Sequence, residues 1–267
     1  MESDRMLTPY PDVNHLLRQL EVEIRSTLGG HFIGMYLYGS LALGDFNPQT
    51  SDIDFIVVTD QELPNELLQA LQAMHTRIAA GPSHWANELE GSYIPQRALR
   101  RYDPDSACHP HIDRGSGRLE VEQHDSDWVV QRYSLREYGV TLAGPAINSM
   151  IDPISPADLR QAVLDLLWWW ELQLVDTSRV ERSDYQAYAI LSMCRILYTF
   201  QFGTIASKPA AAHWAQRSLG APWAGLIEQV LTWQPEKPLG QLENTLGFIR
   251  YTLEQGQRLE QKPRKRN

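Results

Sequence analysis

The 267-residue sequence has few cysteines, no long hydrophobic run and no excess of positive charge. Its two cysteines, Cys108 and Cys194, lie far apart, which excludes a disulfide framework. No apolar run approaches the ~20 residues that a membrane-spanning helix needs. Residues 1–10 also lack the charged-then-apolar order of a signal peptide. We therefore expect a cytoplasmic protein without a membrane partner.

The net charge of −9 argues against a nucleic-acid partner, because binding a phosphate backbone requires a positive surface that displaces counterions. The one basic cluster, residues 262–266, is expected to be a solvent-exposed tail. An acidic surface instead favours small cationic substrates.

A Gly-Ser turn and an aspartate pair lie between two apolar runs. The first run, residues 35–38, predicts a buried strand, and Gly39 and Ser40 after it predict a strand-to-helix corner that can bind phosphate. Asp52 and Asp54 enter the second predicted strand, residues 53–58, two positions apart and hence on one face. Singly, each aspartate could be an ordinary turn or strand-end residue. Together they suit Mg²⁺ with bound triphosphate oxygens.

The order of Gly39, Ser40, Asp52 and Asp54 resembles the signature of the DNA polymerase β-like nucleotidyltransferase superfamily. Within that superfamily the chain is most similar to the aminoglycoside adenylyltransferases that inactivate streptomycin and spectinomycin. The narrower resemblance rests on residues 89–92, 142–145 and 191–208. It implies an α/β (α+β) nucleotidyltransferase domain with a small mixed sheet, followed by an all-α helical bundle domain.

The spacing of apolar residues along the chain predicts the same division into an α/β domain and a helical domain. Helices are expected over residues 13–28 and 67–78, and a third strand over 89–94, whereas only helical patterns follow the joint near 150–155. We therefore predict domains 1–152 and 153–267. Further helices are predicted from Ser155, the expected N-cap, to Leu174, and over residues 185–202, 209–219, 222–233 and 239–260.

The segment from residue 96 to residue 117 is polar and is expected to be a loop. It contains Cys108, His109, Pro110 and His111, but no second ligand pair follows at a convincing spacing, so we expect no metal site there. Leu119, Val121 and residues 128–130 predict further sheet or a hairpin.

Nucleotidyl transfer is the in-line attack of a hydroxyl on an α-phosphate, which requires a metal, positioning and a base. Asp52 and Asp54 are the predicted Mg²⁺ ligands. Glu90 is the predicted base, because it lies on the third strand in a segment that resembles the family segment with the catalytic glutamate. Glu122 and then Glu120 are the alternatives.

Arg195 and Lys208 lie in the predicted helical domain. Judged from the residues alone, Arg195 could equally well pair with a structural carboxylate, and Lys208 could equally well be merely exposed. The resemblance implies instead that both bind the triphosphate of ATP together with Gly39 and Ser40. An active site of this kind would form only when the two domains face each other.

Three consecutive tryptophans, residues 168–170, cannot share one apolar stripe because adjacent helical residues point about 100° apart. We expect Trp170 in the core and Trp169 or Trp168 against substrate. Nearby acidic residues could bind substrate amines, namely Glu171, Asp176, Glu181 and Asp184.

The resulting hypothesis is a monomeric, Mg²⁺-dependent adenylyltransferase that transfers AMP from ATP to a hydroxyl of a small cationic substrate, an aminocyclitol antibiotic. Two alternatives stay open: the same chemistry on a protein or RNA acceptor, and a nucleotide-binding module without catalysis. The acidic net charge disfavours RNA. The presence of Asp52, Asp54 and Glu90 disfavours a non-catalytic module.

Overall fold

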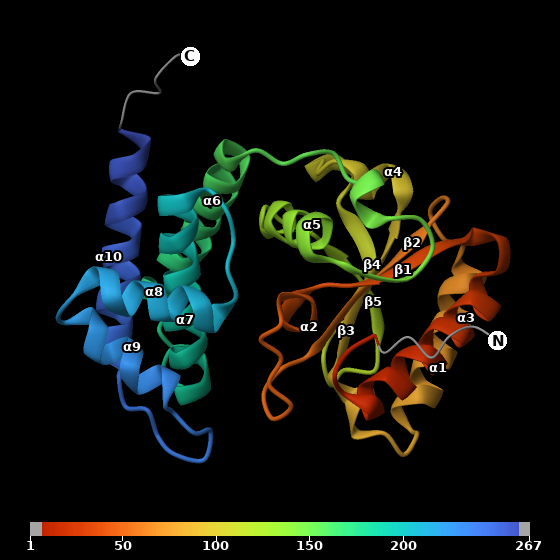
Figure 1. Ribbon diagram of the computed structural model, residues 1–267, viewed down its shortest axis with the longest axis horizontal. Helices are drawn as coiled ribbons and strands as arrows, with labels where there is room; N and C mark the ends of the chain where they lie inside the picture. Colours follow the sequence, from red (N-terminus) through yellow and green to blue (C-terminus); the bar gives the residue numbers. More distant parts are fainter. Residues whose placement is uncertain (1–6, 262–267) are drawn as a thin grey trace. The chain divides into compact units, whose positions relative to one another are not determined.

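The computed structural model describes residues 7–261 (Figure 1). Internal contacts divide the chain into two compact units that join between Pro153 and Ile154. The first contains a mixed sheet with helices and the second contains helices alone, which confirms the predicted fold class. No helix of residues 7–261 is long and apolar enough to cross a membrane. The basic residues 262–266 lie outside the described residues.

The sheet of the first unit has six strands in the order β5-β4-β3-β2-β1-β6. Its strands are β1 Phe32–Leu37, β2 Ile53–Thr59, β3 Leu89–Pro95, β4 Cys108–Ile112, β5 Leu119–Gln123 and β6 Val140–Ala143. β2 and β3 run parallel, whereas the other neighbouring strands run antiparallel. The predicted third strand beside the first two is thus confirmed.

Five α-helices of the described residues accompany this sheet, and two of them, α2 and α4, are short (Figure 1). They are α1 Pro11–Leu28, α2 Gly39–Leu43, α3 Asn65–Ala79, α4 Gln96–Arg100 and α5 Asp127–Tyr138. Short 3₁₀ turns are η1 Gly29–His31, η2 His84–Glu88, η3 Pro104–Ser106 and η4 Ile147–Ser149. Helix α2 begins at Gly39, separated from the end of β1 by one residue, which confirms the predicted strand-to-helix corner.

The hydrophobic core of the unit lies between one face of the sheet and helices α1 and α3. Leu17 of α1 and Met74 of α3 are buried in one cluster with Phe55 of β2 and Tyr93 of β3. Successive strand residues point to opposite faces, so Asp54, next to Phe55, lies on the face away from this core. The core therefore leaves one face of β2 and β3 available for polar side chains.

Two sequence predictions in this unit are wrong. The polar segment around His109 is not all loop, because residues Cys108–Ile112 form β4, which pairs with β5 along its length. Residues 128–130 are not sheet but the first turn of α5, in which Trp128 and Val130 are buried. Tertiary packing of these two residues overrides their preference for strands.

The second unit is helical throughout. Its helices are α6 Pro156–Val175, α7 Ser183–Phe202, α8 Lys208–Leu219, α9 Trp223–Leu231 and α10 Leu242–Glu260. As predicted, Ser155 caps α6: its hydroxyl accepts the Asp158 N–H at 3.1 Å, and the Asp158 carboxylate accepts the Ser155 N–H at 3.0 Å. Gly203 ends α7 with a φ of +66°.

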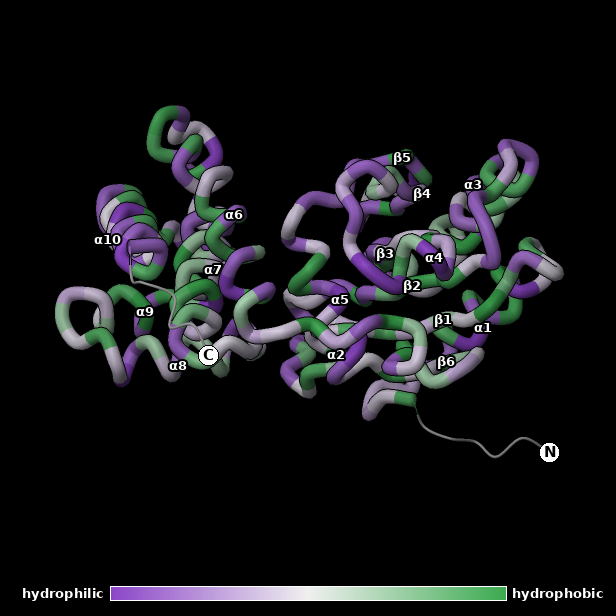
Figure 2. Tube along the Cα trace, turned by 90° about the horizontal axis from the view of Figure 1, so that it is seen from above, coloured by the Kyte–Doolittle hydropathy of each residue, from purple (hydrophilic) through white to green (hydrophobic). Residues whose placement is uncertain are grey.

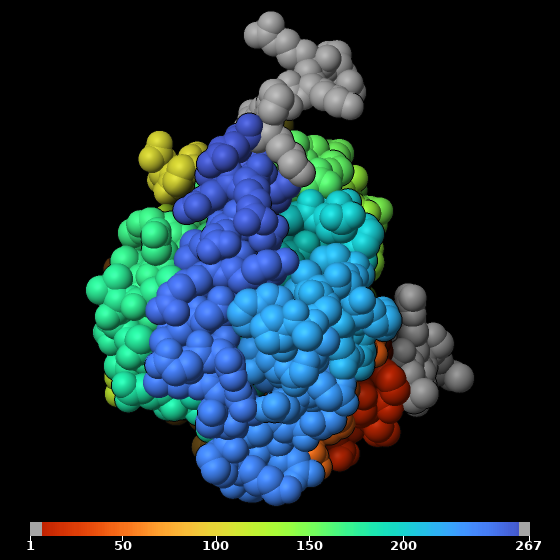
Figure 3. Space-filling model, turned by 90° about the vertical axis from the view of Figure 1, so that its left-hand side faces the viewer, coloured from red at the N-terminus to blue at the C-terminus, as the bar shows by residue number. Residues whose placement is uncertain are grey.

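Both hydrophobic and hydrophilic residues line these helices, which bury their apolar sides against one another (Figure 2). Helix α10 packs against α6 and α7, and α8 packs against α7 and α9. Figure 3 shows α10, in dark blue, crossing one face of this unit between α6 and the α8–α9 pair.

Candidate active site

Three carboxylates converge at one end of the parallel strand pair. The side chains of Asp52, Asp54 and Glu90 place their ligand oxygens within 4.8 Å of one another, and all three are half-buried. The pairing of β2 with β3 sets Asp54 directly across from Glu90. Alternation along β2 puts Asp52 on the same face as Asp54. We refer to these three residues as the carboxylate group.

Gly39 makes room for this arrangement. Its φ is +62°, and a β-carbon built there would lie 1.8 Å from Oδ2 of Asp54. Only glycine combines this backbone conformation with so close an approach. The preceding N–H of Tyr38 donates to the Asp54 carbonyl oxygen at 3.2 Å, which fixes the corner against β2.

Tyr38 places a neutral phenol beside the carboxylate group. The side chain is buried, and burial raises its pKa well above the usual range; Asp54, Glu90, Asp52 and Asp127 raise it further. Tyr38 therefore keeps its proton at neutral pH. The sequence analysis missed both Tyr38 and Asp127, although the position of Tyr38 directly before Gly39 was a usable signal.

Asp127 contributes a fourth acidic residue from α5, the helix that contacts α2. Burial raises the pKa of Asp127, and Asp125 raises it further. Several carboxylates near one buried phenol repel one another unless a cation lies among them. Oxygen ligands in this number are those that Mg²⁺ prefers, so the residues present fit a magnesium ion held by Asp52 and Asp54.

Ser40, the predicted phosphate ligand, lies in α2 directly after Gly39. Its hydroxyl oxygen is buried and has no hydrogen-bond partner among the described residues. A buried hydroxyl without a partner is costly in a folded protein, and a bound phosphate oxygen would remove that cost.

The two alternative bases lie elsewhere. Glu120 is exposed on β5. Glu122, also on β5, is grouped with His111 and Asp113 and not with the two aspartates. Of the three glutamates that the sequence offered, the structure brings only Glu90 to Asp52 and Asp54.

The two basic residues predicted to bind triphosphate, Arg195 and Lys208, have different surroundings in the second unit. Arg195 is half-buried in α7. Lys208 begins α8, and its Nζ lies 4.8 Å from the centroid of the Tyr188 ring, a cation–π distance. Ser207 caps this helix by accepting the Ala210 N–H at 3.3 Å.

The tryptophan run of α6 separates as the helical geometry requires. Trp170 is buried at 4% exposure, which confirms its core role, whereas Trp168 is 66% exposed. Trp169 is half-buried and meets Trp170 edge-on, with ring centroids 4.9 Å apart. Trp168 therefore presents the most open ring of the three.

Two of the four acidic residues predicted to bind substrate, Glu171 and Asp184, have different surroundings. Glu171 is exposed on α6. Asp184 forms an ion pair with Arg182 at 2.5 Å, and the hydrogen bond from Arg182 lowers the pKa of Asp184. A substrate amine at Asp184 would therefore have to compete with Arg182.

Comparisons with known proteins match both units. Residues 17–93 match the nucleotidyltransferase domain family. Residues 149–239 match the family described as aminoglycoside adenylyltransferase, C-terminal domain. The first match contains the carboxylate group, and the second contains Arg195 and Lys208.

Curated relatives align over most of this chain and of their own length. An aminoglycoside (3'') (9) adenylyltransferase of Shigella flexneri is 26% identical over 251 residues, which cover 90% of this chain and 93% of the relative. A spectinomycin 9-adenylyltransferase of Staphylococcus aureus is 25% identical over 212 residues, 76% of this chain and 77% of the relative. These matches confirm the resemblance that the sequence motifs predicted.

A solved structure supports the fold. Spectinomycin adenyltransferase AAD(9) from Enterococcus faecialis, crystallised with ATP and spectinomycin, matches with a TM-score of 0.68 at 18% identity. The match covers 90% of this chain and 98% of the other.

Proposed function

We propose that this chain, a nucleotidyltransferase whose residues 149–239 match the C-terminal domain family of aminoglycoside adenylyltransferases, adenylylates an aminocyclitol antibiotic. The reaction transfers AMP from ATP to a hydroxyl of a small cationic acceptor of the streptomycin or spectinomycin type. The convergence of Asp52, Asp54 and Glu90 carries the proposal, because metal ligands and a base are what this reaction requires.

Two further observations support the acceptor class. The relatives in Shigella flexneri and Staphylococcus aureus are named as aminoglycoside and spectinomycin adenylyltransferases, and they align over most of their length. The net charge of −9 suits a cationic acceptor and disfavours an RNA end.

Each member of the carboxylate group has a separate role in the proposed reaction. Asp52 and Asp54 hold Mg²⁺, which when bound neutralises charge on the phosphate oxygens. A carboxylate oxygen of Glu90, across from Asp54 on β3, accepts the proton of the attacking hydroxyl. Tyr38 stays protonated and adds no further negative charge to the site.

Nucleotide and acceptor contacts come from the other predicted residues. Gly39 and Ser40 bind phosphate oxygens through the backbone and the unpartnered hydroxyl. Arg195 and Lys208 bind the triphosphate. Residues Trp169, Glu171 and Asp184 contact the acceptor. We further propose that the enzyme acts as a monomer in the cytoplasm, where ATP is available, with the domains 1–152 and 153–267.

Pyrophosphate release tests the proposal. The purified protein, with ATP and Mg²⁺, is assayed against a panel of streptomycin, spectinomycin, other aminoglycosides and an uncharged polyol. We expect release with at least one aminocyclitol and none with the polyol, and mass spectrometry should show the acceptor gaining one AMP. Release that depends on a protein or RNA acceptor instead would overturn the acceptor assignment.

Nucleotide binding without release, over the whole panel, would overturn the catalytic assignment. The Asp54→Asn variant serves as the negative control, since it retains the fold but lacks one proposed metal ligand.

A further inference from the structure

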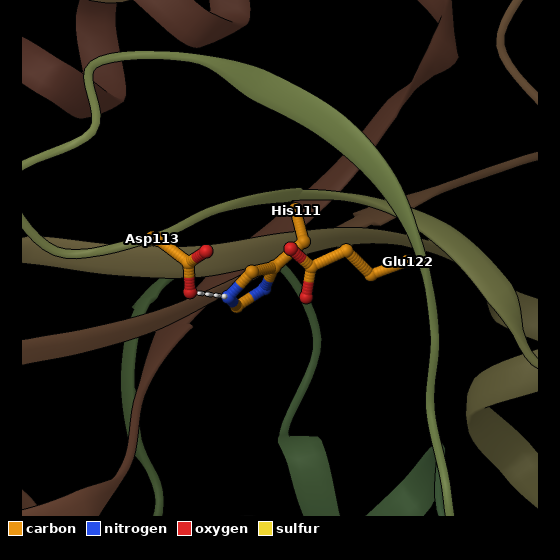
Figure 4. Close-up of side chains that lie close together, drawn as sticks. All are labelled: His111, Asp113 and Glu122. Carbon is orange, nitrogen blue, oxygen red and sulfur yellow. Dashed lines mark ion pairs between the residues drawn. The ribbon is translucent and has the colours of Figure 1, made fainter. Parts of the chain in front are cut away.

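A second group of potential metal ligands lies on β4 and β5, outside the proposed reaction. It consists of His111 in β4, Asp113 directly after β4, and Glu122 in β5, and we call these residues the His111 group. One ligand atom from each lies within 4.8 Å of the other two. In Figure 4 both carboxylates turn toward the imidazole ring, Asp113 meeting it at one edge.

The ring of His111 is fixed in place by its neighbours. Its side chain is 9% exposed, and Ser92, its pairing partner on β3, is fully buried. The Ser92 Oγ lies 2.7 Å from Nδ1 of His111, and the other ring nitrogen, Nε2, lies 3.4 Å from Oδ1 of Asp113. Metal-binding histidines typically hold one ring nitrogen in this way while the other faces the ion.

The hydroxyl of Ser92 also lies near a second imidazole, and its one proton can be donated to either ring. It lies 3.3 Å from Nε2 of His124. When the single Ser92 proton is donated to His124, the Ser92 oxygen accepts the Nδ1–H of His111. The Nε2 lone pair of His111 is then free to face the two carboxylates.

The two carboxylates are close enough to repel each other. Burial raises the pKa of Glu122, the nearby Asp113 raises it further, and only His111 lowers it. Asp113 itself is 62% exposed, so an ion can reach the group from solvent. A divalent cation between them would remove this repulsion.

We propose that His111, Asp113 and Glu122 bind a divalent transition-metal ion of the Zn²⁺ class. One imidazole nitrogen with two carboxylate oxygens favours such an ion over Mg²⁺, which prefers oxygen ligands alone. The all-oxygen carboxylate group and the His111 group thus differ in the metal they select. Three protein ligands leave a coordination position for water. The ion would join the end of β4 to β5.

This proposal departs from the expectation of no metal near Cys108 and His111. That expectation rested on the absence of a second ligand pair at a suitable spacing along the chain. The antiparallel pairing of β4 with β5 supplies Glu122 from the neighbouring strand, so linear spacing was the wrong criterion.

Equilibrium dialysis with Co²⁺ or Zn²⁺, in excess Mg²⁺ to occupy the carboxylate group, tests the proposal. We expect one bound ion per chain and, with Co²⁺, a visible absorption band. Asp113→Asn and Glu122→Gln should each weaken binding by at least about tenfold, and Ser92→Ala, through loss of ring orientation, by ~10- to 100-fold. Zn²⁺ should raise the melting temperature of the wild type and not of Glu122→Gln.

Glu120→Gln is the matched control, because Glu120 is exposed on the same strand and the substitution removes the same charge. Binding in this variant should equal wild type. The proposal is overturned if the wild type binds no ion, if both Asp113→Asn and Glu122→Gln bind normally, or if Glu120→Gln loses as much. If binding is lost only in the Asp54→Asn variant, the ion belongs to the carboxylate group, and this result also overturns the proposal. None of these readouts depends on turnover.

Discussion

Replacing Gly39 with alanine tests whether the corner after β1 holds Asp54 in position. A β-carbon at residue 39 would lie 1.8 Å from Oδ2 of Asp54 and 2.5 Å from its Cγ, whereas ordinary contacts begin near 3.4 Å. The Asp54 carboxylate must therefore leave its position in the carboxylate group. Because a misplacement of ~1 Å can lower a rate ~10²-fold, we expect turnover to fall by at least about that factor.

Gly44 provides the matched control. It ends the same short helix with a φ of +78°, and nothing among the described residues lies within 4 Å of a β-carbon built there. Alanine at either position costs about 1–2 kcal/mol for the left-handed backbone. Only Gly39→Ala must also displace Asp54, so denaturant titrations should show a loss in its free energy of unfolding at least as large as that of Gly44→Ala.

Only Gly39→Ala should lose turnover and weaken Mg²⁺ binding. The assay is pyrophosphate release at saturating ATP and acceptor, with a Mg²⁺ titration of each variant. Equal turnover in the Gly39→Ala and Gly44→Ala variants would show that the space left by glycine at residue 39 is not needed to hold Asp54 in the carboxylate group.

Four further outcomes are expected. Asp54→Asn should abolish turnover and leave the fold intact, since it removes a ligand and a like charge; near-wild-type turnover in Mg²⁺ would disprove the metal assignment. Glu90→Gln should cut turnover by ~10²–10⁴-fold with ATP affinity largely kept, as calorimetry would show. Lys208→Ala should weaken ATP binding roughly tenfold or more, because a charge-assisted contact is worth ~1.5–3 kcal/mol; unchanged affinity would remove Lys208 from the nucleotide site. Burial lowers the pKa of His109 to about 4 and that of His124 to about 2, so below the ordinary value near 6.5 the unfolded chain binds more protons. The free energy of unfolding should be greatest above about pH 6.5 and should decrease as the pH falls toward 4. Denaturation midpoints that do not change over this pH range would contradict this.

The parts of the site that follow from local periodicity were predictable. Asp52 and Asp54 lie on one face because strand residues alternate. Glu90 was chosen from its place on a predicted third strand together with the resemblance of residues 89–92 to a family segment, and β3 places it across from Asp54. Tyr38 and Asp127 were not found, because their relation to the carboxylate group depends on a buried position and on the packing of α5.

Strand β4 was missed for a different physical reason. Pro110 lacks an N–H and reads as a loop residue, but the pairing with β3 covers only His111 and Ile112, so Pro110 lies where β4 pairs with β5 alone. His109 and His111, on either side of Pro110, are polar and lie on the same face of the sheet as Ser92. The alternation of apolar and polar residues therefore did not predict β4. The strand is stabilised by its pairing with β5 along its whole length.

The parallel pairing of β2 with β3 has a consequence for folding order. Antiparallel neighbours can form as local hairpins, but Asp54 and Glu90 come together only after α3 and η2 have carried the chain back across the sheet. Closing this crossover is a long-range step that costs chain entropy before any contact repays it. A chain with β3 undocked has both aspartates and no site. Affinity for Mg²⁺, followed during refolding, would thus report the moment at which the crossover closes.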